Sequence, residues 1–171
     1  IHEHTAAEKP WAACGHGGKR PHNIINSLYL QAEELERLVV ERFQRYEKVK
    51  GELHMAEQYL TGDAEIVVTA YGSVARLAKA AVDSARAQGI KAGLVRPVTL
   101  WPFPEQEVRD ACRNAKRVLC VEMSMGQMIE DVKLALGCRL PVEFFGRTGG
   151  VIPKPSEILE QIKALNAKEA E

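Results

Sequence analysis

The chain has 171 residues, of which 46% are hydrophobic and 27% are charged, the balance of an ordinary globular domain rather than of a disordered segment. Basic and acidic residues number 23 each, so the chain lacks the basic excess that a nucleic-acid partner requires. No apolar run approaches the roughly 20 residues of a membrane span, and the N-terminus lacks the layout of a signal peptide. We therefore expect a cytoplasmic domain that binds neither nucleic acid nor a membrane.

The cysteines and histidines predict no metal site. Cys14, Cys112, Cys120 and Cys138 are scattered, which is typical of a reduced, cytosolic protein and gives no local set of ligands for zinc or for an iron–sulfur cluster. All five histidines precede residue 55, and they lack the spacing of metal ligands. The chain begins at Ile1 rather than at a methionine. We therefore expect it to be part of a longer protein.

The first third of the chain contains one clear helical pattern. Residues 1–29 show no sustained period and are predicted to be an arm or linker, mobile or ordered only by packing on another chain. From about residue 30 to residue 49, apolar residues recur at steps near 3.6 and charged residues fill the other face, which predicts an amphipathic helix. Residues 53–60 are ambiguous, because they could continue this helix or form a short edge strand.

After Gly62 the sequence alternates between apolar, β-branched strands and helices. The expected strands are residues 66–70, 92–95, 118–121 and 142–145, and helices are expected to follow each of them. Ser73 is placed to cap the first of these helices. Four strands that alternate with helices through short loops predict a three-layer α/β domain with a mainly parallel sheet of four or five strands.

Ligands and partners of such sheets meet the loops at the carboxyl ends of the strands. The first of these loops, Tyr71-Gly72-Ser73, lacks the glycine-rich dinucleotide pattern, and no Walker loop occurs in the chain. The amides at the start of the following helix could hold an anion, although a tight strand-to-helix turn is the favoured alternative. In residues 146–150, three glycines flank Arg147, which could bind a carboxylate or phosphate or could simply be solvated.

The remaining loops indicate interfaces rather than catalysis. Glu122 ends a strand, where it could orient a neighbouring chain or, as we favour, cap the next helix. Cys120 lies in mid-strand and is expected to be a buried hydrophobe, and no histidine follows residue 62, so no Ser–His–Asp set and no catalytic residue are predicted. Exposure of the apolar loop 101–104 would make that loop an interface. The candidate interface or ligand residues are Tyr71, Gly72, Ser73, Arg76, Trp101, Glu122, Gly126, Gln127, Gly146, Arg147, Gly149 and Gly150.

Four segments together resemble domain II of the 2-oxoacid:ferredoxin oxidoreductases. They are residues 66–76 (IVVTAYGSVAR), 89–104 (GIKAGLVRPVTLWPFP), 121–127 (VEMSMGQ) and 146–150 (GRTGG), within a resemblance that spans about residues 57–162. Trp11 and residues 15–20 and 26–29 resemble the segment that joins domains I and II of the α subunit, closest to the branched-chain (2-oxoisovalerate) type. The chain departs from the family at Ser124, where the family pattern has asparagine. A hydroxyl could replace part of the contact of that amide.

The resemblance implies a thiamine-diphosphate enzyme that oxidatively decarboxylates a 2-oxoacid to an acyl-CoA and reduces ferredoxin. It implies that residues 1–29 are an arm or linker from an N-terminal pyrimidine-binding domain and that residues 30–62 are a connecting helix with a possible edge strand. Residues 63–171 would then be a flavodoxin-like, transketolase C-terminal-like domain without a catalytic role. Such domains commonly carry an extra antiparallel strand, for which residues 55–60 are the candidate.

The resemblance also implies where the cofactors and partners lie. Thiamine diphosphate, iron–sulfur clusters and coenzyme A would belong to the whole complex, and this segment would bind none of them. Its partners would be its own N-terminal domain, the beta and gamma/delta subunits, ferredoxin for the whole enzyme, and possibly a second copy in a homodimer. Arg147 is expected to dock the domain onto one of these partners. The competing hypothesis is a free-standing flavodoxin-like module that binds a small anion or nucleotide through the Gly72 and Arg147 loops.

Overall fold

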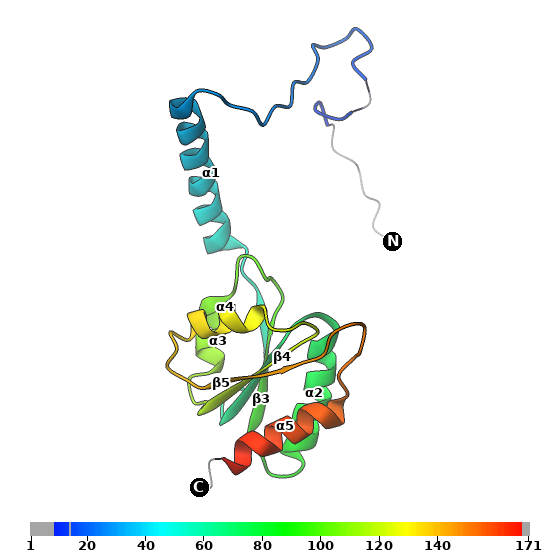
Figure 1. Cartoon of the computed structure of the whole chain (residues 1–171), viewed down its shortest axis with the longest axis vertical. Coiled ribbons are helices and arrows are strands. Elements are labelled where there is room, and N and C mark those ends of the chain that lie inside the picture. The colour runs from blue at the N-terminus through cyan, green and yellow to red at the C-terminus, as the bar shows by residue number, and fades with distance from the viewer. Residues whose placement is uncertain (1–8, 14, 169–171) are drawn as a thin grey trace. The chain divides into compact units, whose positions relative to one another are not determined.

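The computed structural model describes residues 9–13 and 15–168, so Cys14, His2 and His4 lie outside the described residues. The elements in chain order are α1 (Ala32–Glu52), β1 (Ala56–Tyr59), β2 (Ile66–Ala70), α2 (Gly72–Arg86), β3 (Ala92–Pro97), α3 (Glu105–Ala111), β4 (Arg117–Glu122), α4 (Met128–Ala135), β5 (Val142–Gly146) and α5 (Pro155–Ala167) (Figure 1). The chain divides into two compact units, Ile1–Arg42 and Phe43–Glu171. None of the helices in the described part of the chain is long and apolar enough to cross a membrane.

The described residues before α1 form turns and extended chain, as the absence of a periodic pattern predicts. Short-range polar contacts fix some of these turns. An Arg20 Nη2 atom donates to the backbone oxygen of Ala12 at 3.0 Å, and the Asn26 side chain both donates to and accepts from the backbone of Leu28 at 2.9 Å. That this arm packs on another chain stays a prediction, and its first eight residues lie outside the described part.

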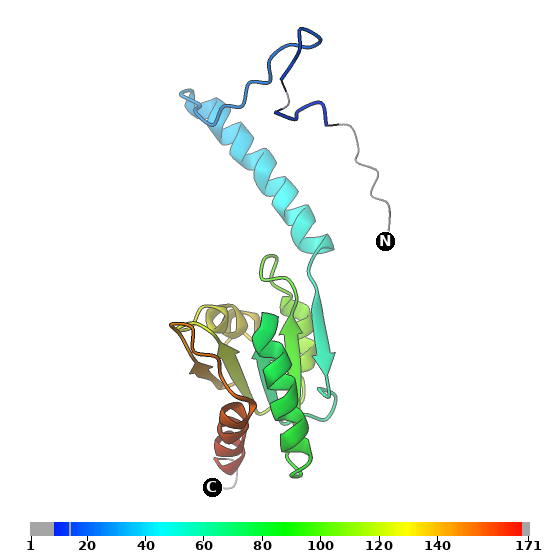
Figure 2. The ribbon, with the colours of Figure 1, turned by 90° about the vertical axis from the view of Figure 1, so that its right-hand side faces the viewer.

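The second unit contains a five-stranded sheet in the order β1-β3-β2-β4-β5. The pairs β2–β3, β2–β4 and β4–β5 are parallel, whereas β1 runs antiparallel to β3, with Ala56 opposite Pro97 and Tyr59 opposite Leu94 (Figure 2). The α/β prediction is therefore confirmed, and the ambiguous segment 55–60 contains the expected antiparallel edge strand.

Helices cover both faces of the sheet, α2 and α5 on one side and α3 and α4 on the other (Figure 1). All five residues of β2 are buried, because successive side chains enter opposite cores: Ile66 and Val68 face α2 and α5, and Val67 faces α3 and α4. Full burial of one such aliphatic side chain stabilises the fold by about 1.5–3 kcal/mol.

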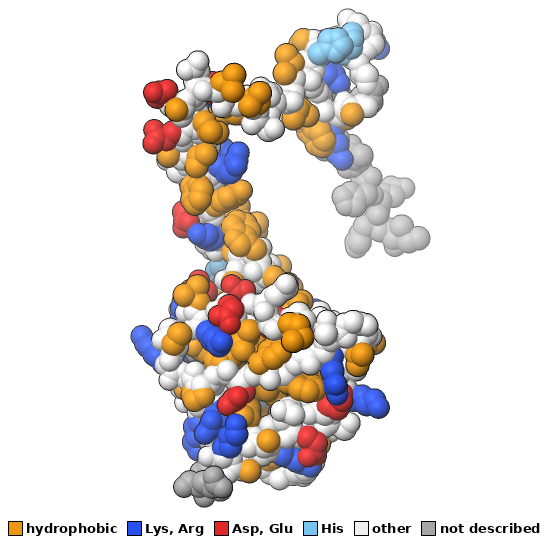
Figure 3. All heavy atoms as spheres, viewed as in Figure 1, with side chains coloured by type: hydrophobic (Ala, Val, Ile, Leu, Met, Phe, Trp, Pro, Cys, Tyr) orange, Lys and Arg blue, Asp and Glu red, His pale blue; other side chains and the backbone are white. Residues whose placement is uncertain are grey.

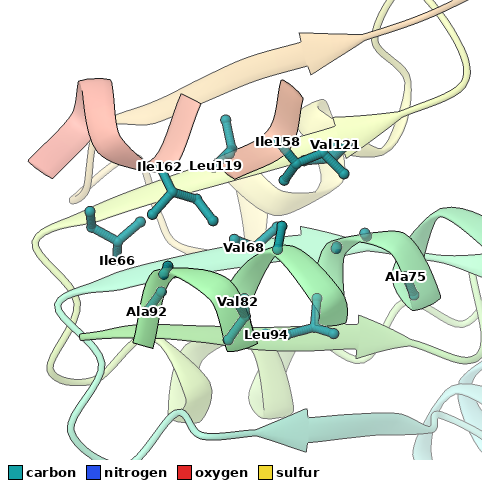
Figure 4. Packing of buried hydrophobic residues seen from close by; sticks show 14 of the residues in the cluster. Ile66, Val68, Ala75, Val82, Ala92, Leu94, Leu119, Val121, Ile158 and Ile162 are labelled. Atoms are coloured by element: carbon teal, nitrogen blue, oxygen red, sulfur yellow. The ribbon is translucent and has the colours of Figure 1, made fainter. Parts of the chain in front are cut away.

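The core between the sheet, α2 and α5 is built from aliphatic side chains of both helices. Ile158 and Ile162 of α5 lie against Leu119 and Val121 of β4 (Figure 4). Val82 of α2 belongs to the same cluster. This packing fixes the start of each helix at the carboxyl edge of the sheet, where the predicted site residues lie.

Gly93 of β3 is required by a close approach of the chain. A Cβ atom at this position would lie 2.6 Å from the backbone oxygen of Leu60 and 2.9 Å from the Cβ of Ala64. The connection between β1 and β2 therefore packs directly on the β3 backbone. Any side chain at position 93 would push this connection away.

Candidate functional site at the carboxyl edge of the sheet

The turn between β2 and α2 is built around a glycine in the left-handed region. Gly72 has φ +58° and is the first residue of α2, and Tyr71 before it is extended and makes no side-chain cap hydrogen bond. Side chains rarely adopt the conformation of Gly72, which explains the glycine. The prediction that Ser73 caps α2 is wrong, because Ser73 already lies inside the first turn and a capping side chain must precede the helix.

A cleft of about 1,030 Å³ opens beside this turn, lined by α2, the strands β1 and β3, and Ile152. Its lining contains three cationic side chains, Arg76, Lys79 and Arg96, but one carboxylate, Glu57. Arg96 Nη1 donates to Glu57 Oε2 at 3.0 Å. Lys79 Nζ lies 4.2 Å from the centre of the Tyr59 ring.

The cleft therefore presents an excess of positive charge. The guanidinium of Arg76 makes no side-chain hydrogen bond or ion pair with any described residue. Gly72, Ser73 and Arg76 were predicted as site residues from the sequence. Lys79, Arg96 and Tyr59 were not. Lys79 could have been found, because it lies three residues after Arg76 on the same helix, so that the two side chains share a face. Arg96 and Tyr59 come from other strands, and no local pattern connects them to Gly72.

Glu122 ends β4 as a fully buried carboxylate. Its Oε2 accepts the backbone N–H of Met128 and its Oε1 that of Ile129, both at 3.0 Å, and Gln127 donates its N–H at 3.1 Å. Burial by itself would raise the pKa of Glu122, but these amides and the Ser124 hydroxyl outweigh burial and hold the pKa below its usual value. Of the two roles expected for Glu122, the structure thus shows the helix cap: the carboxylate holds the start of α4 rather than facing a partner.

Ser124, the departure from the family pattern, completes this arrangement. Its Oγ donates to Glu122 Oε2 at 3.0 Å and accepts the N–H of Gly126 at 3.1 Å. Gly126 has φ +105°, which again favours glycine. The result is a fixed loop between β4 and α4 from which the Met125 side chain projects, 81% exposed.

Arg147 is held by its own domain. Its Nη2 donates to the carboxylate of Glu157 in α5, and its guanidinium carbon lies 5.8 Å from the centre of the Phe145 ring. The backbone N–H of Lys154 and the Arg147 guanidinium together lower the pKa of Glu157. The alternative of a merely solvated arginine is therefore corrected, because the fold supplies Glu157 as a partner ten residues further along the chain. That Arg147 docks the domain onto another part of the enzyme stays a prediction.

The glycines around Arg147 have separate roles. A Cβ at Gly146 would lie 2.5 Å from the backbone oxygen of Ser124, so this glycine lets β5 approach the β4–α4 loop. Gly149 and Gly150 have φ +64° and +87° and turn the chain towards α5. Because Arg147 pairs with Glu157 and is not among the residues that line the cleft beside Gly72, the free-standing module that uses both loops is not favoured.

Trp101 is exposed. Its loop, residues 101–104, was predicted from the sequence to be an interface if it were exposed. Its ring lies 5.3 Å from that of Tyr46, and Tyr46 is 5.8 Å from Phe43. Phe43 and Trp101 are more than half exposed. The interface itself stays a prediction.

The thiols of the described residues do not fit an iron–sulfur cluster. Cys112 and Cys120 are buried, whereas Cys138 is exposed. Burial raises the pKa of Cys112 to about 12 and also raises that of Cys120, so both remain protonated thiols. The prediction that Cys120 is a buried hydrophobe is confirmed. No group of three or more His, Cys, Asp or Glu side chains in residues 9–13 and 15–168 could hold a metal ion.

The fold is a three-layer α/β domain. At the carboxyl edge of its sheet, the buried carboxylate of Glu122 and the Arg147–Glu157 ion pair fix the loops and the starts of the helices. Residues 64–158 match the family of the pyruvate:ferredoxin oxidoreductase core domain II. The chain belongs to this family, which confirms the resemblance inferred from the four sequence segments.

Curated relatives are subunits of 2-oxoacid oxidoreductases. The ketoisovalerate oxidoreductase subunit VorB of Methanothermobacter marburgensis is 43% identical over 155 residues, which cover 91% of this chain and 44% of the relative. The 2-oxoglutarate synthase subunit KorA of the same organism is 40% identical over 105 residues, 61% of this chain and 28% of the relative. The chain thus spans less than half the length of these relatives.

Two solved structures share the fold at low identity. A 2-oxoglutarate:ferredoxin oxidoreductase from Magnetococcus marinus, with 2-oxoglutarate, coenzyme A and succinyl-CoA bound, matches 80% of this chain and 24% of its own with a TM-score of 0.68 and 20% identity. A split-gene transketolase, an inactive beta4 tetramer, matches 64% of this chain and 40% of its own with a TM-score of 0.54 and 17% identity. The predicted transketolase-like architecture is confirmed.

Proposed function

We propose that the chain is the second core domain of a subunit of a 2-oxoacid:ferredoxin oxidoreductase. This class of enzyme oxidatively decarboxylates a 2-oxoacid, transfers the acyl group to coenzyme A and reduces ferredoxin. The observation that carries the proposal is the 43% identity to a ketoisovalerate oxidoreductase subunit over 91% of this chain. The same observation favours a branched-chain 2-oxoacid as the substrate.

In this proposal the domain supports the reaction without performing it. No group of thiols within the described residues could hold a cluster, and the carboxylate of Glu122 at the carboxyl edge already accepts the amides of α4. Thiamine diphosphate, iron–sulfur clusters and coenzyme A would be held by other parts of a cytoplasmic complex. Residues 1–29 would be the arm from an N-terminal pyrimidine-binding domain, residues 30–62 the connection, and residues 63–171 the domain itself.

The carboxyl edge of the sheet is the surface that would contact the N-terminal domain and the beta and gamma/delta subunits. Met125, Val151 and Ile152 are exposed there. The Arg76 guanidinium faces the neighbouring cleft without a partner among the described residues. Apolar side chains on loops fixed by Glu122 and Arg147, beside an unpaired cation, suit a partner surface that carries a carboxylate.

The test is an assay of the assembled complex that contains this chain. Reduction of ferredoxin or of a viologen dye is followed with 2-oxoisovalerate, pyruvate or 2-oxoglutarate in the presence of coenzyme A. We expect activity to require both an oxoacid and coenzyme A, with the highest kcat/KM for 2-oxoisovalerate. Absence of oxoacid-dependent reduction by the fully loaded complex contradicts the proposal, and a preference for pyruvate or 2-oxoglutarate contradicts its substrate assignment.

The docking surface is tested separately by charge reversal. Arg76→Glu should weaken the assembly of the complex, whereas Arg113→Glu should not, because Arg113 lies after α3 and pairs with Asp110. Size-exclusion chromatography of the complex measures both variants. Equal assembly of the two variants would show that Arg76 faces solvent in the complex.

A further inference from the structure

The cleft beside α2 carries positive charge that ion pairs within the domain only partly neutralise. Arg76, Lys79 and Arg96 line it, and Glu57 supplies the one carboxylate of the lining. Three positive charges against one negative charge leave two uncompensated there. Basic and acidic side chains are intermixed on the face drawn in Figure 3. The cleft departs from that balance and should attract anions.

The register of β1 and β3 places one of these cations on the strand side of the cleft. Tyr59 lies opposite Leu94, and both belong to the core cluster under α2. Glu57 and Arg96 are opposite each other, two residues from that pair, and therefore share its face of the sheet. Arg96 Nη1 donates to Glu57 Oε2 at 3.0 Å, which leaves the Nη2 group of Arg96 without a hydrogen bond to any described residue.

The helix side of the cleft supplies the other two cations. Arg76 and Lys79 are three residues apart on α2, a spacing that places side chains next to each other on the helix surface. Lys79 Nζ lies over the Tyr59 ring, which directs its ammonium group towards β1. Neither side chain forms an ion pair with a described residue. Both therefore keep donors for a ligand.

The stability of α2 does not account for these cations. The positive end of the helix dipole lies at the start of a helix and favours acidic side chains there. The first turn of α2 contains no acidic residue, and no side chain caps it. Arg76 follows directly after this turn, so it adds to the positive potential instead of balancing it.

The volume and the apolar part of the lining indicate a small organic ligand. The cleft measures about 1,030 Å³, at the upper end of the range of small-molecule sites, about 300–1,000 Å³. Leu77, Leu94 and Ile152 provide apolar contact beside the cations. A phosphate monoester carries a charge of about −1.5 to −2 at neutral pH and three acceptor oxygens, whereas a carboxylate carries a single charge and two oxygens. The phosphate matches the two uncompensated charges.

We propose that the cleft between α2 and the strands β1 and β3 binds a small organic phosphate monoester. Arg76, Lys79 and Arg96 donate to the phosphate oxygens, and the apolar side chains contact the organic group. The inference rests on the cleft and not on the proposed enzymatic role. Because Arg76 also belongs to the proposed docking surface, binding is measured on the chain without partner subunits, so that the two proposals can fail independently.

Proton–nitrogen NMR titration of the 171-residue chain tests the proposal, with phenyl phosphate, inorganic phosphate and benzoate as probes at about 150 mM salt. We expect phenyl phosphate to bind with a Kd below about 1 mM and to shift the amides of residues 72–79 and 94–96. Inorganic phosphate, which lacks the apolar group, should bind about threefold more weakly. Benzoate should bind at least about tenfold more weakly, because it carries one charge.

Arg76→Gln and Arg96→Gln should each weaken the binding of phenyl phosphate at least about fivefold, because each removes a charge and a forked donor. Lys79→Met, which keeps the length of the side chain, should weaken binding at least about threefold. Lys163→Met is the matched control: Lys163 lies on α5, pairs with Glu160 and is outside the cleft. It should leave the Kd unchanged. The dispersion of the spectra establishes that each variant is folded.

Three results would overturn the proposal. The first is the absence of amide shifts at about 10 mM phenyl phosphate, a concentration well above the expected Kd. The second is binding that the cleft variants weaken no more than Lys163→Met does, which would show non-specific attraction. The third is equal affinity for benzoate and phenyl phosphate, which would make the cleft a carboxylate site.

Discussion

Arg147 and Glu157 form an ion pair that joins the glycine-rich loop after β5 to the first turn of α5. The same carboxylate accepts the backbone N–H of Lys154 at 2.8 Å, so it also caps the helix. The backbone N–H of Arg147 in turn donates to the backbone oxygen of Glu122 at 3.1 Å. Two loops that are far apart in the sequence are thereby fixed against each other.

Replacing Arg147 by alanine should lower the free energy of unfolding only slightly. The pair is partly exposed, with 41% of the arginine side chain and 30% of the glutamate side chain accessible. Ion pairs of this kind contribute about 0.2–1 kcal/mol. Urea denaturation of the variant measures the change, and Arg147→Lys should retain part of the interaction. A decrease in the free energy of unfolding of more than about 2 kcal/mol would contradict this prediction, because it would show that the Arg147–Glu157 pair is desolvated.

Glu122→Gln should destabilise the domain at neutral pH by about 1.5–3 kcal/mol, because the carboxylate accepts amide hydrogen bonds that a neutral side chain makes more weakly. The pKa of Glu122 is lowered in the folded state, so its contribution is fully present above the unfolded pKa of about 4.5 and is lost as the pH falls through the folded value. The difference between wild type and variant should therefore shrink below about pH 4. Urea denaturation at several pH values tests this. A difference that does not depend on pH would contradict the charged cap.

Gly93→Ala should cost about 1–3 kcal/mol, the usual penalty for overpacking, because the new Cβ would lie 2.6 Å from the oxygen of Leu60. Gly62→Ala is the control, since a Cβ at that position meets nothing within 4 Å. Thermal unfolding compares the two variants. Equal melting temperatures would mean that the β1–β2 connection moves aside without cost.

Glu65 should titrate with a pKa of about 2, because Lys116 and Lys91 donate hydrogen bonds to its two carboxylate oxygens. Carbon-detected NMR titration measures the value directly. Replacing both lysines by methionine should return the pKa towards 4.5. In the wild type the interaction is present above the unfolded pKa and disappears only as the pH falls to about 2. An unchanged pKa in the double variant would exclude the lysines as the cause.

The parts of the fold that could be predicted are those with a local signal. β2 is a continuous apolar run because helices cover both of its sides, and Glu122 is recognisable as a strand-end carboxylate before a helix. β1 has no such pattern, since Ala56–Tyr59 is partly exposed at an edge and becomes a strand by pairing with β3. The prediction that Ser73 caps α2 was wrong because the helix already begins at Gly72, one residue before Ser73.

Partners that are distant in sequence could not be predicted. The guanidinium of Arg86 donates to the backbone oxygens of Ala92 and Leu60 and to both carboxylate oxygens of Asp63. No residue near Arg86 in the sequence indicates these contacts, which arise only when α2 packs beside β3 and the β1–β2 connection. The cationic cleft was missed for the same reason.

The antiparallel edge strand also has a consequence for synthesis of the chain. Tyr59 of β1 is translated before its register partner Leu94 of β3, which follows 35 residues later. At the usual 5–20 residues per second, the ribosome needs about 2–7 s to make this interval. During that time β2 and α2 emerge, whereas the N-terminal strand has no neighbour to pair with. Until β3 has been made, β1 must stay soluble without a strand to pair with. The polar side chains of Glu57 and Gln58 in β1 keep it soluble.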